Sequence, residues 1–543
     1  MTKPPRAAAE SSVTAESRAV VRHLGRRRFL TVSGTAAALA LGTNLPSTAR
    51  AAPDLDPRRI GDDPFTLGVA SGDPRPDSVV LWTRLAPRPY EPDSGMPAAR
   101  TAVRWEIAHD ERFHRVAARG QATAHPEFHH AVHVEAQGLS PGRDYHYRFH
   151  TGRWTSPAGR TRTAPAPGSS PAGLRFGLLS CQAYYDGHYT ALGHLAREEG
   201  LDAVFHLGDY LYEYAVDAAG GHRRYTDRAL PALFAREAVT LEDYRLRYSL
   251  YKTDPDLAAA HAAHPWIVTW DDHETENNYA NGVSEDGVPT EEFLLRRAAA
   301  YRAYYENMPL RRPQRPQGPD LRLYRRLHYG RLAQFDVLDT RQYRDDQAGG
   351  DGWKVPTPES EDPARTMLGA TQERWLLDGW RRSEAVWNVV PQQVVFSRRR
   401  NRVDGPWPLS MDAWDGYPGA RERVLAGAEA AGVANLVLLA GDVHVHYGLD
   451  VKRDFDAPDS RTAGVEIVTS SVSSGRDGAR RPVNWQTLMT ANPHLRFYDG
   501  RRGYVLLGLD REKLRADYRT VDAVTVPGAP ISTAASYVSA AGE

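Results

Sequence analysis

The sequence predicts an α/β protein preceded by a small all-β domain. Residues 64–165 consist of short β segments between turns that contain Gly and Pro. From residue 174 onward, apolar runs alternate with helical stretches, which is the pattern of a layered α/β domain. Polar residues follow the ends of these apolar runs, as expected where strands lead into a ligand site. With 41% hydrophobic and 25% charged residues in a chain of 543, the composition is that of a globular protein.

Residues 1–51 are predicted to be an export signal. Arg26 and Arg27 stand shortly before a weakly apolar run rich in Ala, Gly and Thr, and "ARA" before Ala52 fits a cleavage site. A paired arginine in this setting is typical of the twin-arginine pathway, so we expect that machinery as a partner and a secreted, extracellular protein. The rest of the chain carries 60 basic and 66 acidic residues, a net charge of −6. This balance argues against a nucleic-acid partner.

The all-β domain, residues 64–165, is predicted to be a small antiparallel sandwich of the immunoglobulin or fibronectin type. Its strand candidates are "SVVLWTRL", "AVRWEIAHD", "HHAVHVEAQGL" and "DYHYRFHTG". The Pro- and Gly-rich stretch "TAPAPGSSPAG" then reads as a linker to the second domain, residues 174–543.

Five predicted strands of the second domain end in polar or thiol side chains. These are Cys181; Asp209 and Tyr212; Asp271, Asp272 and His273; Gln392 and Gln393; and Asp442, His444 and His446. A single Asp after a strand is most often a turn or helix-capping residue. Five such strand ends are better explained by one shared site, because ligands bind beyond the carboxyl ends of strands in open α/β sheets.

The mixture of side chains predicts metal ions. Crowded carboxylates repel one another, and multivalent cations remove that cost. Thiolate and imidazole suit a transition metal, whereas carboxylate and amide oxygens suit calcium or magnesium. We therefore expect more than one metal, of different softness, with a bridging carboxylate. Cys181 is the only cysteine, so no internal disulfide is possible.

The order of Cys181, "GDYLY", "WDDHE" and "GDVHVH" resembles the motif series of the metallophosphoesterases. "GDYLY" is also similar to the signature in which a tyrosine of purple acid phosphatases binds ferric iron. Three positions depart from the usual pattern: Cys181 and Asp272 replace Asp and Asn, and Asp442 replaces His. These departures, with "GVASGDP" near the start of the mature chain, resemble the PhoD-type alkaline phosphatases, which include phosphodiesterases and a phospholipase D activity.

The resemblance implies a two-layer β-sandwich flanked by helices, one Fe³⁺ and two Ca²⁺ ions. Cys181, Asp209, Tyr212 and His444 would hold the iron, Asp209 would bridge to calcium, and Asp272 and Asp442 would complete the oxygen sites. The implied enzyme is a phosphoric ester hydrolase that cleaves phosphate mono- and diesters with a metal-bound hydroxide. Phospholipid headgroups are an alternative substrate class, and we expect a monomer.

Four further residues are weaker candidates. His273 could donate a proton to the leaving oxygen, bind phosphate, or orient another group. Asn278 could bind substrate or serve as a helix cap. Arg341 could clamp a phosphate with two hydrogen bonds or make an ordinary salt bridge. Gln393 stands where the wider superfamily has a His ligand. His446 would point away from His444 in extended chain and would lie outside the ligand set.

Other enzyme classes fit the sequence less well. A cysteine phosphatase would need an Arg six residues after Cys181, where the chain has Gly187. A serine hydrolase would need a G-x-S-x-G turn, and "SVSSG" lacks its first Gly. A secreted calcium-binding protein without catalytic activity would have little use for a thiolate. Aromatic residues near the predicted site, including Tyr184, Tyr185 and Trp353, could line its rim or pack in the core.

Overall fold

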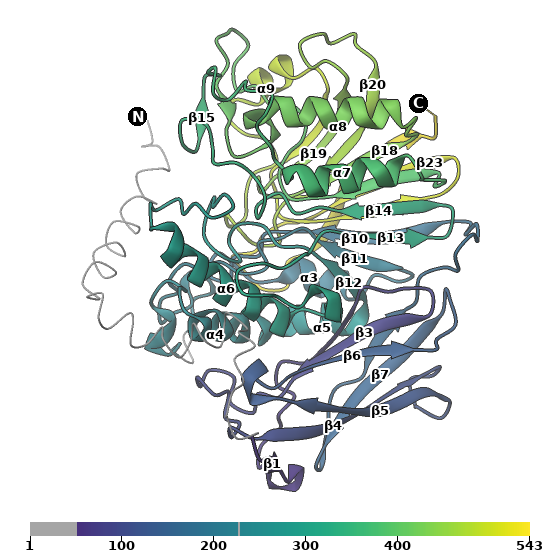
Figure 1. Cartoon of the computed structure of the whole chain (residues 1–543), viewed down its shortest axis with the longest axis vertical. Coiled ribbons are helices and arrows are strands. Elements are labelled where there is room, and N and C mark those ends of the chain that lie inside the picture. The colour runs from purple at the N-terminus through teal and green to yellow at the C-terminus, as the bar shows by residue number, and fades with distance from the viewer. Residues whose placement is uncertain (1–51, 226–228, 543) are drawn as a thin grey trace.

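The computed structural model describes residues 52–225 and 229–542 (Figure 1). The predicted export signal, residues 1–51, lies outside the described residues. Two large β-sheets pack together with helices on their outer sides, and a third sheet lies at the end of the molecule near the beginning of the described chain. No helix in the described ranges has both the length and the apolar character that a membrane span requires.

The first large sheet has nine strands and contains the start of the predicted α/β domain. Its parallel centre is formed by β10, β11 and β12, with β2 also parallel to β12. In spatial order the strands are β24 (Ile531–Ala540), β23 (Lys513–Val521), β22 (Gly503–Leu509), β10 (Leu174–Leu179), β11 (Ala203–His206), β12 (Pro265–Val268), β2 (Val69–Gly72), β3 (Ser78–Arg84) and β6 (Ala131–Gln137).

The second large sheet has seven strands, four of them parallel neighbours. In spatial order the strands are β13 (Arg325–Tyr329), β14 (Ala333–Val337), β16 (Trp387–Pro391), β18 (Leu436–Ala440), β20 (Thr462–Val468), β19 (His446–Lys452) and β21 (Leu495–Asp499). The parallel set is β14, β16, β18 and β20.

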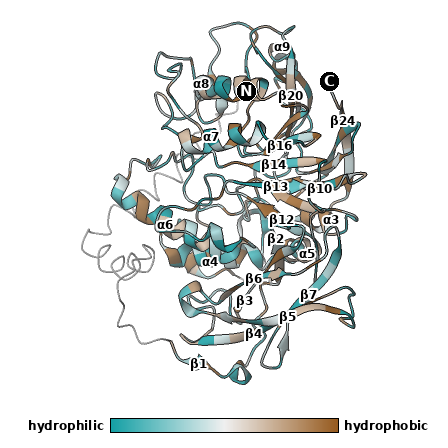
Figure 2. Ribbon diagram, turned by 45° about the vertical axis from the view of Figure 1, so that its right-hand side comes forward, coloured by the Kyte–Doolittle hydropathy of each residue, from teal (hydrophilic) through white to brown (hydrophobic). Residues whose placement is uncertain are grey.

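The main core lies between these two sheets. The ring of Phe335 from β14 packs against Phe176 of β10 and Phe205 of β11, with ring centroids 4.9 Å away in both pairs. All three side chains are buried, and aliphatic residues of both sheets complete the layer. Figure 2 shows hydrophobic colour gathered on strands in the middle of the molecule, including β12. The predicted two-layer sandwich is therefore confirmed.

Helices cover the outer face of each large sheet. The nine-stranded sheet packs against α3 (Thr190–Leu195), α4 (Leu241–Lys252), α5 (Pro255–Ala263) and α6 (Thr290–Asn307). The seven-stranded sheet packs against α7 (Gly369–Trp380) and α8 (Pro418–Ala430), and α9 (Trp485–Ala491) lies farther along the chain. Local sequence fixes some of these helix starts: Thr240 and Asp243 form a reciprocal capping box at α4.

The N-terminal β region contains the four predicted strands as β3, β4, β6 and β7. Its own sheet contains β1 (Asp54–Leu55), β4 (Arg100–Ala108), β5 (Val116–Ala124), β7 (Asp144–Thr151), β8 (Trp154–Thr155) and β9 (Gly159–Arg162). This sheet packs over β2, β3 and β6 around a buried apolar core. Because β2 also pairs with β12, one layer of this sandwich is continuous with the nine-stranded sheet. The domain limits at 165 and 174 remain predictions.

The two large sheets meet at the carboxyl ends of their parallel strands. Ser180, just after β10, forms a parallel bridge with Ser471, just after β20. The backbone N–H of Gly441, after β18, donates to the carbonyl of Gln393, after β16, at 2.7 Å. The loops that carry the predicted site residues are thus held together at one edge of the molecule.

Candidate metal centre

Several of the predicted site residues have left-handed backbone conformations. Their φ angles are +58° at Cys181, +56° at Asp209, +65° at Asp442, +55° at His444 and +50° at Asn278. Non-glycine residues seldom adopt this region, and such strain tends to collect at functional sites. Here it turns the chain sharply just after the strands.

The glycines before two of these aspartates permit very close packing of the loops. A Cβ atom at Gly208, where φ is +113°, would lie 2.3 Å from the backbone nitrogen of Asp271. A Cβ atom at Gly441 would lie 2.4 Å from Ser180 Oγ. The Gly-Asp pairs seen in the sequence therefore have a steric reason, since only glycine lets the neighbouring loops approach this closely.

Cys181, Asp209 and His444 form the first group of possible metal ligands. Sγ, a carboxylate oxygen and a ring nitrogen from these three residues all lie within 4.8 Å of one another. The Tyr212 hydroxyl donates to Asp209 Oδ2 at 2.8 Å and lies 3.1 Å from His444 Nε2. The structure thus brings together the four side chains for which the sequence suggested iron.

Two oxygen-rich groups continue from the first. Asp209, Asp272 and His273 form one, and Asp271, Asp272 and Asp442 form the other, each with ligand atoms within 4.8 Å. Asp209 and Asp272 each belong to two groups, which is the arrangement of bridging carboxylates. Asp271 was recognised in the sequence as a strand-end residue but was not among the predicted ligands.

Two buried carboxylate oxygens without a hydrogen bond indicate that cations fit this cluster. Asp209 Oδ1 and Asp272 Oδ1 are buried and accept no hydrogen bond among the described residues, although Arg341 Nη2 lies 3.4 Å from Asp272 Oδ1. Buried polar atoms are nearly always hydrogen-bonded, so these two need an explanation. Burial raises the pKa of Asp209 well above its ordinary value, and the carboxylates of Asp272 and Asp271 add to the effect. Cations at these oxygens would remove both problems.

A nearby cation would also stabilise the ionised forms of the Cys181 thiol and the Tyr212 phenol. Burial, with the Asp209 carboxylate next in importance, raises the pKa of Cys181 and of Tyr212 well above their ordinary values. The thiolate and the phenolate would therefore form only if a multivalent cation stabilised their negative charge. A soft thiolate, an imidazole and a phenolate on one side, with carboxylates on the other, suit two kinds of metal.

Arg341 is surrounded by the acidic residues of this cluster. Its side chain is fully buried and pairs with Asp271, while Nη1 donates to both oxygens of Asp412 at 2.8 Å. Nη2 lies 3.3 Å from Asp442 and 3.4 Å from Asp272. With its donors facing carboxylates, Arg341 is placed to balance charge and to hold the acidic loops together.

His273 is hydrogen-bonded to a buried glutamate, Glu213, which was not among the site residues predicted from the sequence. Its Nδ1 lies 2.8 Å from Glu213 Oε2, and Glu213 Oε1 accepts from the backbone N–H of Asn277 at 2.8 Å. The imidazole also packs on Tyr212, with ring centroids 4.1 Å apart. Burial lowers the pKa of His273, but the carboxylates of Glu213, Asp272 and Asp209 outweigh it and hold that pKa well above its ordinary value.

Asn278 and Gln393 occupy different surroundings. The backbone N–H of Asn278 donates to Asp272 Oδ2 at 2.6 Å, so Asn278 lies directly at the cluster. Gln393 accepts from Thr340 through Oε1 and donates to Thr269 Oγ1 at 2.9 Å through Nε2. Its amide thus ties neighbouring loops together from a fully buried position.

Glu274 joins two of the loops that carry the candidate ligands. The sequence did not predict this role. Its carboxylate accepts from the backbone N–H groups of Asp209, Tyr210 and Asp271, at 3.1, 2.7 and 2.9 Å. Burial raises the pKa of Glu274 to about 8. Its place in "WDDHE" was visible, but its hydrogen bonds to a loop more than sixty residues earlier were not.

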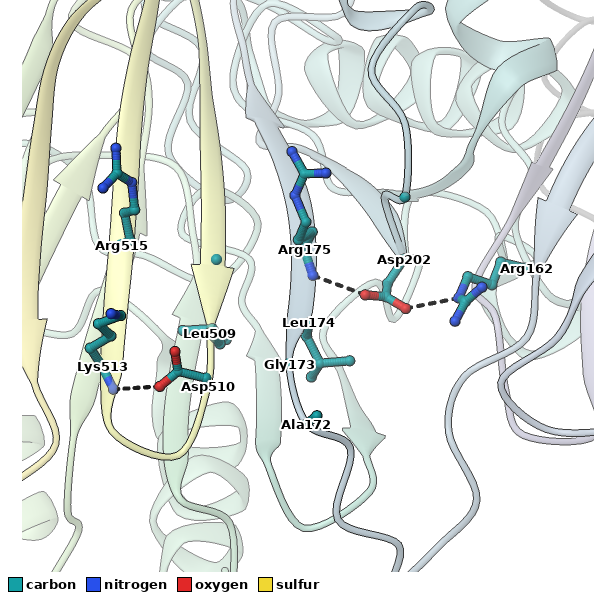
Figure 3. A pocket seen from close by; sticks show the side chains of 12 residues that line it. Arg162, Ala172, Gly173, Leu174, Arg175, Asp202, Leu509, Asp510, Lys513 and Arg515 are labelled. Atoms are coloured by element: carbon teal, nitrogen blue, oxygen red, sulfur yellow. Dashed lines mark hydrogen bonds and ion pairs between the residues drawn. The ribbon is translucent and has the colours of Figure 1, made fainter.

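Figure 3 shows a pocket of about 590 Å³. It lies away from the metal cluster, near the start of β10, whereas Cys181 follows the end of that strand. It is lined by Leu174 at the start of β10 and Leu509 at the end of β22. Asp202 in its wall accepts from Arg162 Nε and from the backbone N–H of Arg175, both at 2.9 Å. The candidate metal ligands are absent from its lining, so this pocket is not part of the candidate metal centre.

Comparison with known proteins agrees with this architecture. Residues 176–518 match the model of the PhoD-like phosphatase family, and residues 48–165 match that of its N-terminal domain. Alkaline phosphatase D of Bacillus subtilis (strain 168) is 47% identical over 517 residues, which cover 94% of this chain and 87% of the relative. A solved structure described as that of PhoD superposes with a TM-score of 0.85 at 49% identity, covering 88% of this chain and 91% of the other.

These matches extend over both the β region and the α/β region, and they include the strands whose ends carry the metal-ligand cluster. The chain belongs to the PhoD-like phosphatase family and is an alkaline phosphatase D-like phosphoesterase, a phosphoric ester hydrolase.

Proposed function

We propose that the cluster holds Fe³⁺ and Ca²⁺ and that this centre hydrolyses phosphate mono- and diesters. Cys181, Asp209, Tyr212 and His444 would hold the iron, with Asp209 shared. Asp272 and Asp442, joined by Asp271, would supply oxygens to calcium. The observation that carries the proposal is the buried Oδ1 of Asp209, which has no hydrogen-bond partner among the described residues and belongs to a residue common to two neighbouring ligand groups.

Bound cations would supply Lewis acidity, which stabilises charge on the phosphoryl oxygens and makes a bound water more acidic. The protein's own contribution is to hold the carboxylates in place. Glu274 fixes the loops of Asp209 and Asp271, and Arg341 offsets part of the negative charge of Asp271 and Asp442. Such preorganised positioning is the main source of catalysis in phosphoryl transfer.

His273 is the proposed proton donor to the leaving group. The contact of Nδ1 with Glu213 fixes the ring and leaves Nε2 as the reacting nitrogen. As water attacks phosphorus and the ester P–O bond breaks, the leaving oxygen takes the proton from Nε2. The attacking water loses its proton to solvent, so the products are an alcohol and a phosphate, or a phosphomonoester from a diester. Asn278 is the proposed neighbour of the substrate; the placements of Arg341 and Gln393 favour supporting roles.

Metal analysis combined with activity tests this proposal. Protein purified without added metal should contain iron and calcium, absorb visible light through thiolate- or phenolate-to-iron charge transfer, and lose activity when calcium is chelated. Restoring calcium should restore activity. Colourless, fully active protein that contains only zinc would contradict the iron assignment.

We also propose that the mature enzyme acts outside the cell after twin-arginine export. Exchange of Arg26 and Arg27 for Lys should stop secretion while cytoplasmic protein still folds, because a receptor reads the arginine pair. Folding is followed by phosphoesterase activity in the cell extract. Unchanged secretion of the double variant would show that another route is used.

A further inference from the structure

The edge of the molecule around the metal cluster carries an exposed surface of unusual composition. We call it the Trp/Arg rim and define it as residues 349–356, 398–407 and 476–485. Among the described residues, eight large hydrophobic side chains are strongly exposed, and four of them belong to this rim. They are Trp353, Val355, Val403 and Val483, of which Val483 is 109% exposed and Trp353 44% exposed.

The three segments of the rim are connected with one another. The Arg399 guanidinium lies over the Trp353 ring, 5.3 Å from its centroid. The Arg400 backbone N–H donates to Asn492 Oδ1 at 2.8 Å, just past the end of α9, and α9 begins at Trp485 in the third segment. Figure 1 shows β15 (Trp353–Lys354) and α9 at the same end of the molecule.

The rim also borders the candidate metal centre. Asn278, whose backbone N–H binds Asp272, donates through Nδ2 to Asp351 Oδ2 at 2.7 Å. The Arg502 guanidinium donates to the carbonyls of both His444 and Arg476. A ligand surface resting on the rim would therefore lie next to the proposed metal ligands.

Charge separates the Trp/Arg rim from the rest of the chain. Its three segments contain seven Arg and one Lys against three Asp, a net charge of +5, although residues 52–543 as a whole have a net charge of −6. Arg398 and Arg400 pair with Asp456. Within the described residues, no ion pair engages Arg402, Arg480 or Arg481, and all three are exposed. The rim thus offers uncompensated guanidinium groups beside exposed apolar side chains.

We propose that the Trp/Arg rim docks the enzyme on an anionic lipid surface. Arginine binds lipid phosphates with paired hydrogen bonds, and tryptophan prefers the boundary between headgroups and acyl chains. A soluble polyanion would explain the arginines but would gain nothing from Val355, Val403 and Val483. Lipid explains both features, because apolar burial and attraction to anionic headgroups add in interfacial binding.

Vesicle sedimentation tests the proposal without using catalysis. Full-length mature protein should sediment with vesicles of phosphatidylcholine mixed with phosphatidylglycerol, bind pure phosphatidylcholine much less, and be released by salt. The triple variant R402Q/R480Q/R481Q should bind the anionic vesicles on the order of a hundredfold more weakly, at about fivefold per arginine. W353S/V483S should also weaken binding, and this loss should persist at higher salt.

The matched control is V538S/R511Q/R382Q, which removes exposed apolar and basic side chains elsewhere on the molecule. It should bind like the unchanged protein, and all of these variants should keep their activity on a water-soluble ester. Absence of binding to anionic vesicles, equal binding to both vesicle types, or equal loss in the control would overturn the proposal. So would binding of a soluble polyanion that competes fully with vesicles and is unaffected by W353S/V483S. None of these results bears on the proposed hydrolysis, which is measured separately.

Discussion

Cys181 supplies the sulfur atom of the candidate metal centre. Its buried thiol lies with Asp209 and His444 in one ligand group, and the sequence lacks the arginine that a nucleophilic cysteine would need to cradle phosphate. Binding of metal therefore explains its position better than attack on phosphorus.

Replacing Cys181 separates these two roles. C181D supplies a hard ligand and should keep measurable activity while changing the visible absorption and the metal preference. C181S supplies a poorer ligand and should lose more, on the order of 3 kcal/mol of transition-state stabilisation or about a hundredfold in rate. Steady-state rates and absorption spectra of both variants check this. A phosphorylated Cys181 trapped by rapid quench would contradict it.

Glu213 is expected to act through His273. In E213Q the amide has one oxygen for two donors, so the hold on His273 Nδ1 or on the Asn277 N–H is lost. We expect kcat to fall about tenfold to a hundredfold for an alkyl phosphate ester, which needs a proton on its leaving oxygen. A nitrophenyl ester, whose leaving group needs little help, should be affected much less.

The leaving-group comparison distinguishes positioning from general damage to the fold. H273N should show the same pattern as E213Q, because both remove the oriented proton donor. The control is E237Q, which alters a glutamate paired with Arg296 of α6 and should reduce the rates on both substrates equally or not at all. Equal losses on both esters in E213Q would refute the positioning role.

At the scale of elements, the turns after the strands determine the site. G208A should destabilise the protein by about 3 kcal/mol, from its left-handed φ and from the collision with the Asp271 backbone. Gly138 also has a positive φ, +78°, but nothing lies within 4 Å of an added Cβ, so G138A should cost only about 1 kcal/mol. Denaturant unfolding measures both. Equal costs would show that the loop contact at Gly208 is unimportant.

The sequence predicted these elements where the signal is local. The apolar runs before Cys181, Asp209, Asp271 and Asp442 are strands, as predicted. The sequence showed both the length of each strand and its end, because a polar residue or a glycine follows each apolar run. The pairing of β2 with β12 was not predicted, since it joins residues nearly two hundred positions apart. Local alternation does not reveal such a partner.

The same limit applies to the candidate site. Cys181, Tyr212 and His444 could be recognised from motifs close to strand ends. Asp412 and Glu213 could not be predicted. Asp412 pairs with Arg341 but lies in a segment without a motif, and the role of Glu213 depends on its contact with His273, sixty residues later. Arg341 looked like a possible phosphate clamp because its sequence neighbours do not show the four carboxylates that surround it.

At the scale of the whole molecule, buried neutral histidines should make the fold sensitive to acid. Burial lowers the pKa of His130, His264 and His494 to about 4, and all three lie away from the metal cluster. The unfolded chain binds protons at these residues below its pKa of about 6.5, whereas the folded chain does not until about pH 4. Their stabilisation is therefore present above pH 6.5 and is lost as the pH falls through this window.

Between pH 7 and pH 5, each of these histidines should lower the free energy of unfolding by about 1.8 kcal/mol. H264Q keeps a donor for the carbonyl of Leu195, which His264 Nε2 contacts at 3.0 Å, but cannot take up the proton. The pH dependence of its unfolding free energy should be shallower than that of the unchanged protein by this amount. Parallel curves for the two proteins would contradict the assignment.

The central claim is that the cluster at the strand ends holds iron and calcium at separate, neighbouring positions. Anomalous diffraction from a crystal of the protein, measured above and below the iron absorption edge, tests it most directly. We predict an iron peak among Cys181, Asp209, Tyr212 and His444, and calcium density at the oxygens of Asp272 and Asp442. An iron peak elsewhere, or zinc alone beside the Cys181 sulfur, would contradict the account.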